Sequence, residues 1–185
     1  MKWYIQAIKN YVNFNGRARR KEYWMYILFS FVFAIVAMIL DIALGIDFKI
    51  SIYDENLHWN YNYKPKVSLG YGPIYVIVSL FHFLPSMSAA IRRLHDSDRT
   101  GWWLFSPLLI MLFAVFIGLA FVGSGFAINS DSMAGIGIIL MLLLYLAALG
   151  ITITSFVFLC FDGTKGDNRF GPSNKYDSEG NLLSK

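Results

Sequence analysis

The chain has 185 residues, of which 56% are hydrophobic and 15% are charged, and its formal net charge is +4. This composition is too apolar for an ordinary soluble domain. The one cysteine, Cys160, excludes an internal disulfide. We attribute the excess of basic residues to membrane topology rather than to nucleic-acid binding.

Residues 1–14 precede the first apolar run and have a helical pattern of their own. Lys2, Gln6, Lys9 and Asn13 form one polar stripe, and apolar and aromatic residues cover much of the remaining surface. The pattern predicts a short amphipathic helix. It either lies in the inner membrane interface or packs under the ends of the spans.

Four apolar runs are long enough to cross a hydrocarbon core, which takes about 20 apolar residues in a helix. They cover residues 24–45, 71–91, 101–122 and 135–161. The runs leave no room for a sizeable soluble domain. We therefore expect an all-α membrane protein with one four-helix domain over residues 1–172 and a flexible tail over 173–185. The first run has no cleavage pattern after it, so we do not expect a removable signal peptide.

The segment between the first two runs, residues 46–70, alternates with a period of two. Apolar residues at 48, 50 and 52 alternate with polar ones, aromatic residues at 59, 61 and 63 do so again, and residues 54–56 between them favour a turn. This pattern predicts a small β-hairpin on the outer surface. An aromatic belt without regular structure is the alternative.

Basic residues are concentrated on one side of the four runs. Thirteen of the sixteen Lys and Arg residues lie in residues 2–21, 92–99 and 165–185. Short loops rich in Lys and Arg stay in the cytoplasm. We therefore predict a multi-pass protein with both termini cytoplasmic.

Three polar segments meet the cytoplasmic ends of the spans. They read N-F-N-G-R-A-R-R-K-E-Y-W from residue 13, R-R-L-H-D-S-D-R-T-G-W-W from residue 92, and D-G-T-K-G-D-N-R-F-G-P from residue 162. At these residues the sequence resembles domain-of-unknown-function family 805, the YhaH-like bacterial inner-membrane proteins. The resemblance covers nearly the whole chain and implies a four-helix protein of the bacterial inner membrane, without implying an activity. Members typically have glycine where this chain has Asp98.

These segments supply a candidate cluster on the cytoplasmic face. Its members are Arg17, Arg19, Arg20, Arg92, Arg93, His95, Asp96, Arg99, Asp162, Lys165, Asp167, Asn168 and Arg169. Asp162 follows the C-terminal end of the fourth span, where the helix dipole disfavours a negative charge. We therefore predict an ion pair between Asp162 and an arginine of a neighbouring segment.

Two histidines are candidates for chemistry. His95 beside Asp96 could act as a general base with its carboxylate, but adjacent residues on a helix do not face each other, which favours a capping and ion-pair role. His82 is the one ionisable residue deep in an apolar run. A neutral His82 hydrogen-bonded across helices is favoured over one that lines a transport path.

We weigh three functions against these residues. A non-enzymatic scaffold or binding protein is favoured, with anionic lipid headgroups, a protein partner or a second copy of the chain as its contact. The alternative is a small oligomeric transporter or channel. A membrane-interface enzyme is less favoured, because the sequence predicts no catalytic, cofactor or metal site.

Overall fold

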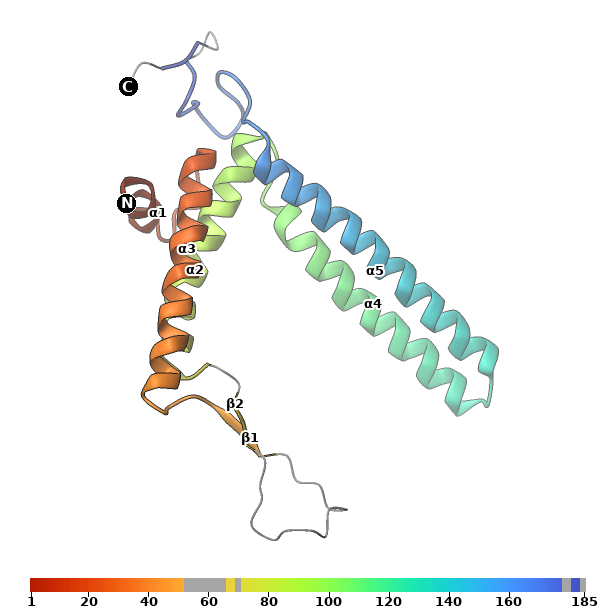
Figure 1. The fold of residues 1–185 in the computed structure, drawn as a ribbon. Helices are drawn as coiled ribbons and strands as arrows, with labels where there is room; N and C mark the ends of the chain where they lie inside the picture. Colours follow the sequence, from red (N-terminus) through yellow and green to blue (C-terminus); the bar gives the residue numbers. More distant parts are fainter. Residues whose placement is uncertain (52–65, 69–70, 178–180, 184–185) are drawn as a thin grey trace. The chain divides into compact units, whose positions relative to one another are not determined.

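The computed structural model describes residues 1–51, 66–68, 71–177 and 181–183, and among these it contains helices and one short pair of strands (Figure 1). In chain order the elements are α1 (Lys2–Lys9), α2 (Arg20–Ala43), β1 (Lys49–Ser51), β2 (Lys66–Ser68), α3 (Pro73–Asp96), α4 (Trp102–Ala127) and α5 (Asp131–Cys160).

The helices α2 to α5 are long and apolar enough to cross a membrane, with mean hydropathy from 1.8 to 2.7. The predicted all-α fold with four spans is therefore confirmed. The helix ends differ from the predicted boundaries. The helix α2 begins at Arg20 rather than at residue 24, and α3 continues to Asp96 rather than ending at 91. Apolar runs mark only the hydrocarbon part of a span, whereas long basic side chains let the helix continue to the polar interface.

The two strands are antiparallel, and Ile50 pairs with Val67 at the centre of the ladder. The first strand lies within the predicted hairpin. Its predicted turn at residues 54–56 and its predicted second strand at 59–63 lie outside the described residues. A hairpin with this turn and this second strand therefore stays a prediction.

The chain divides into two compact units, residues 1–12 with 21–88 and residues 13–20 with 89–185. In the first unit, α1 packs through Tyr4. The Tyr4 ring stacks on Tyr26 with 5.6 Å between centroids, and it lies 5.7 Å from the Phe33 ring. Tyr26 and Phe33 lie within α2, several residues from its start. The short amphipathic helix is thus confirmed, and it packs on the flank of α2 rather than under the ends of the spans.

A proline inside α3 explains a second contact of the N-terminal segment. Pro85 has no N–H, so the carbonyl of Phe81 four residues earlier loses its helical donor. The Tyr11 hydroxyl donates to that carbonyl at 2.7 Å. A hydrogen bond that replaces the lost helical donor contributes about 0.5–1.5 kcal/mol. Tyr11 therefore stabilises the interrupted helix.

This contact gives a double-mutant prediction. Replacing Tyr11 by phenylalanine should cost about 1 kcal/mol of unfolding free energy in detergent, because the Phe81 carbonyl loses its donor. In a Pro85→Ala background the new N–H of residue 85 supplies that donor, so the same change at Tyr11 should cost close to nothing. Equal costs in the two backgrounds would show that Tyr11 does not compensate for the proline.

Asp41, near the end of α2, caps the N-terminus of α3 in the same unit. Its side chain is fully buried, and its carboxylate accepts the backbone N–H groups of Gly72, Ile74 and Tyr75 at 2.9, 3.1 and 2.8 Å. The first N–H groups of a helix have no partner within the helix. A carboxylate there also interacts favourably with the helix dipole. Asp41 therefore caps a helix that begins more than 30 residues later.

In the second unit α4 and α5 form an antiparallel hairpin (Figure 1). Glycines on both helices allow close approach. A Cβ atom at Gly125 would lie 2.7 Å from the Ala134 nitrogen, and one at Gly137 would lie 2.6 Å from the Phe121 Cβ. Near the other end, the Ser155 hydroxyl donates to the Trp103 carbonyl at 2.8 Å. The hairpin thereby fixes the position from which the chain leaves α5.

Candidate functional site

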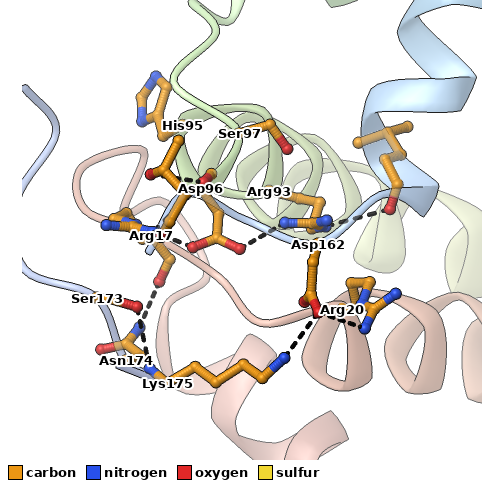
Figure 2. A network of polar contacts seen from close by, with 12 residues as sticks. Arg17, Arg20, Arg93, His95, Asp96, Ser97, Asp162, Ser173, Asn174 and Lys175 are labelled. Atoms are coloured by element: carbon orange, nitrogen blue, oxygen red, sulfur yellow. Dashed lines mark hydrogen bonds and ion pairs between the residues drawn. The ribbon is translucent and has the colours of Figure 1, made fainter. Parts of the chain in front are cut away.

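The three polar segments singled out in the sequence meet within the second unit (Figure 2). At their centre the Asp96 carboxylate joins two arginines. Its Oδ1 accepts from Arg17 Nε at 2.9 Å, and its Oδ2 accepts from Arg93 Nη1 at 2.5 Å. Both arginine side chains are fully buried, and that of Asp96 is 13% exposed. We call Arg17, Arg93 and Asp96 the buried triad.

Arg17 also binds the segment after α5. Its Nη1 donates to the Gly166 carbonyl at 2.7 Å and its Nη2 to the Thr164 carbonyl at 2.6 Å. The backbone reinforces this arrangement, because the Thr164 N–H donates to the Asp96 carbonyl at 2.9 Å. The planar guanidinium suits several acceptors held in a fixed geometry. One side chain thus ties together segments that are about 80 and 150 residues away along the chain, a separation that loop entropy makes costly.

Gly163 is required by the buried triad. A Cβ atom at this position would clash with the Asp96 carboxylate. The glycine of the D-G-T motif therefore lets the chain pass directly over a buried ion pair. This close approach, rather than a need for a flexible loop, explains why glycine occupies position 163.

His95 does not face Asp96. Its ring stacks on Phe170 with 3.9 Å between centroids, and its Nδ1 lies 3.2 Å from the Gly16 carbonyl. The Asp96 carboxylate contacts the two arginines instead. The predicted ion-pair role of Asp96 is thus present, and the described contacts do not form a His–Asp pair. The carbonyl of His95 accepts from Asn168 Nδ2 at 2.9 Å.

Asp98 takes the conformation that glycine would favour. Its φ is 56°, in the left-handed region. Its N–H donates to the His95 carbonyl at 3.0 Å, and the Arg99 N–H donates to the Leu94 carbonyl at 2.9 Å. This pair of hydrogen bonds is a Schellman motif, which ends α3. Aspartate tolerates the left-handed region better than most residues, so the turn is kept without glycine. Arg169 Nε pairs with Asp98 Oδ1 at 3.2 Å.

Asp162 has an arginine partner, as expected, and it is Arg20. Its Oδ2 forms an ion pair with Arg20 Nη2 at 2.9 Å and accepts a hydrogen bond from Lys175 Nζ at 2.8 Å. Burial raises the pKa of Asp162, but the Lys175 hydrogen bond and the charges of Arg20, Lys175 and Arg93 outweigh it and lower that pKa below its ordinary value. The side chain is 43% exposed. The buried acid of the cluster is therefore Asp96 rather than Asp162.

The other candidates lie around the buried triad. Arg92 is buried, and its carbonyl accepts from the Ala18 N–H at 3.0 Å. Arg99 is exposed and its guanidinium lies 4.7 Å from the Phe158 ring centroid. Arg19 is half-buried. Lys165 and Asp167 are exposed, and no ion pair is described for either within residues 71–177.

Two contacts come from residues outside the predicted set. Lys175 reaches Asp162, and Asn174 Nδ2 donates to the Arg17 carbonyl at 2.6 Å. Both follow the last motif, which ends at Pro172. In the sequence, these two residues look like any other polar residues of the tail, so no pattern marks them as members of the cluster.

His82 lies in the first unit and is bonded on both sides of its ring. Nδ1 lies 2.8 Å from the Val78 carbonyl, which only accepts, so in the neutral ring Nδ1 carries the proton. Nε2 then accepts from the Tyr4 hydroxyl at 2.9 Å. The predicted hydrogen bond across helices is therefore present. Its partner is α1 rather than another span.

Comparison with known proteins places the chain in one family. Residues 11–172 match the family described as "Protein of unknown function (DUF805)". The chain is 33% identical to "Inner membrane protein YhaH" of Escherichia coli (strain K12) over 178 residues, which cover 96% of this chain and 99% of that protein. It is 32% identical to "Inner membrane protein YhaI" of the same strain, with the same coverage. No solved structure matches. With its four apolar helices, the chain is a multi-pass inner-membrane protein that belongs to the DUF805 family.

Proposed function

We propose that the protein is a non-enzymatic membrane scaffold whose polar cluster faces the cytoplasm and binds the headgroups of anionic phospholipids. The concentration of basic residues at the ends of the spans supports this orientation. One observation carries the proposal. Two arginines of the cluster are buried and bonded to a carboxylate of the same cluster, whereas its other cations include a set that is exposed to solvent.

The two sets differ in burial. Arg17 and Arg93 are fully buried and bonded to Asp96. The exposed cations are Arg20, Arg99, Lys165 and Arg169. They lie on the segments that the buried triad holds together, so their spacing is fixed by the fold. Each Lys or Arg near an anionic leaflet contributes about 1 kcal/mol of attraction. A surface that presents several of them favours phosphate-bearing headgroups.

Contacts of the two histidines favour binding over chemistry or transport. The ring of His95 stacks on Phe170 and is not oriented by Asp96. Both nitrogens of His82 lie at hydrogen-bond distance from Tyr4 and Val78. A general base of the predicted kind needs its carboxylate against the ring, and the Asp96 carboxylate bonds to Arg17 and Arg93 instead. The contact of His82 with Tyr4 joins α1 to α3, which favours a structural role for His82.

The proposal is tested by lipid binding to the purified protein, followed by native mass spectrometry. We expect phosphatidylglycerol to bind more tightly than phosphatidylcholine with the same acyl chains. Replacing Arg99, Lys165 and Arg169 by glutamine should weaken phosphatidylglycerol binding about 100-fold, at about 1 kcal/mol for each cation. The matched control replaces Lys49, Lys64 and Lys66, which the sequence places on the other side.

Two outcomes would contradict the proposal. One is equal affinity for the two lipids. The other is a stoichiometric protein partner that the three substitutions displace while lipid binding is unchanged. That second result would assign the exposed cations to a protein interface.

A further inference from the structure

Asp162 marks a position where two half-exposed cations converge on one oxygen. Its Oδ2 lies 2.8 Å from Lys175 Nζ and 2.9 Å from Arg20 Nη2 (Figure 2). The exposed fractions of the Asp162, Lys175 and Arg20 side chains are 43%, 35% and 44%. An exposed ion pair contributes only about 0–1 kcal/mol. The carboxylate is therefore held at this position weakly.

This position lies directly beyond the apolar part of the chain. The helix α5 ends at Cys160, and the next residue, Phe161, is 64% exposed. Asp162 follows it, and Arg20 Nη1 lies 3.4 Å from the Cys160 carbonyl. Charged side chains that directly follow an apolar span reach toward the polar interface. Their place in the chain therefore favours a position of the two cations near the lipid phosphates.

A buried charge beneath the pair adds to its positive field. The Arg93 side chain is fully buried, with Nε bonded to the Leu159 carbonyl at 3.1 Å and Nη1 bonded to Asp96. Its Nη2 has no hydrogen-bond partner among the described residues. In Figure 2 Arg93 lies next to Asp162, and its charge contributes to the low pKa of that carboxyl group. Arg17 and Arg93 share a single carboxylate, so this part of the cluster keeps an excess of positive charge.

We propose that Arg20 and Lys175 form a binding site for a phosphate group, and that Asp162 occupies it until a phosphate displaces the carboxylate. The proposal rests on the proposed function and assigns it a particular site. A phosphate diester has two non-bridging oxygens that share its negative charge, so one oxygen can face each cation, whereas the two contacts of Asp162 converge on Oδ2. Asp162 is then an internal competitor that sets the affinity for the ligand.

The test compares charge-matched variants of the full chain in neutral detergent, with a short-chain phosphatidylglycerol as probe. Arg20→Gln and Lys175→Gln should each weaken binding about fivefold. Asp162→Asn should strengthen it about fivefold, because the competitor is removed. The control is Asp167→Asn, an exposed acid five residues later. It should change binding less than about twofold, because it leaves the two cations as they were.

The outcomes separate this site from the general function. If Asp162→Asn weakens binding or leaves it unchanged, or if Asp167→Asn strengthens it equally, the site is wrong while lipid binding stands. If the unaltered chain has no preference for phosphatidylglycerol, the proposed function itself fails. Competition by millimolar inorganic phosphate, lost in Arg20→Gln, would identify free phosphate as the ligand. A lack of such competition would identify the lipid headgroup.

Discussion

Replacing Asp96 by asparagine should destabilise the protein by about 3–5 kcal/mol, the cost of leaving buried charges without their partner. The carboxylate bonds to both Arg17 and Arg93, whose side chains are fully buried. The segment after α5 passes over Asp96 at Gly163 and accepts hydrogen bonds from Arg17 at Thr164 and Gly166. We expect a lower thermal unfolding temperature in detergent and less protein in the membrane fraction.

A control and a double variant make this result specific. Asp167→Asn removes the same charge from an exposed position and should change stability by less than about 0.5 kcal/mol. Arg17→Gln combined with Asp96→Asn should cost clearly less than the sum of the single changes, because the two side chains contact each other. Additive losses, or an Asp96→Asn protein as stable as the Asp167→Asn protein, would refute the role of the buried triad.

Replacing Asp41 by alanine should cost about 2–3 kcal/mol, because three backbone N–H groups at the start of α3 lose a charged acceptor. The Asp41→Asn variant would keep one carbonyl oxygen on the side chain. That oxygen can still accept from Gly72 and Tyr75, the two donors that now share Oδ2. Asp41→Asn should therefore cost less than Asp41→Ala. The amides of Ile74 and Tyr75 should exchange with solvent faster in the alanine variant.

Asp131 is the matched control for this second prediction. It is an exposed acid in the first turn of α5, where it interacts with the helix dipole but has no described backbone donor to satisfy. Its replacement by alanine should cost about 0.3–1 kcal/mol. Unchanged amide exchange at Ile74 and Tyr75 in Asp41→Ala would show that the carboxylate does not cap α3.

The four spans could be predicted because hydrophobicity over about 20 residues is a local property. An arginine partner for Asp162 could also be predicted, but the choice of Arg20 and the buried position of Asp96 could not. Asp96 and Asp162 both lie at the C-terminal end of a helix, and the dipole argument does not distinguish them. What distinguishes them is the burial of Arg17 against Asp96 and the missing side chain of Gly163, both of which depend on distant segments.

The capping role of Asp41 cannot be predicted for a related reason. Its position near the end of a span is clear from the sequence. Its partners are backbone N–H groups 31, 33 and 34 residues later, and backbone groups leave no signature in a sequence. The contact of Tyr11 is easier to predict in part, since Pro85 implies an unsatisfied carbonyl at Phe81. The sequence does not say which hydroxyl donates to it.

The reach of Arg17 also bears on how the chain is made. Synthesis proceeds from the N-terminus, so Arg17 leaves the ribosome early, whereas its acceptors at Thr164 and Gly166 come after the last span. Until α5 has been inserted, the guanidinium that will be buried must remain hydrated or be held by other groups. Closure around Arg17 therefore reports that all four spans have been inserted.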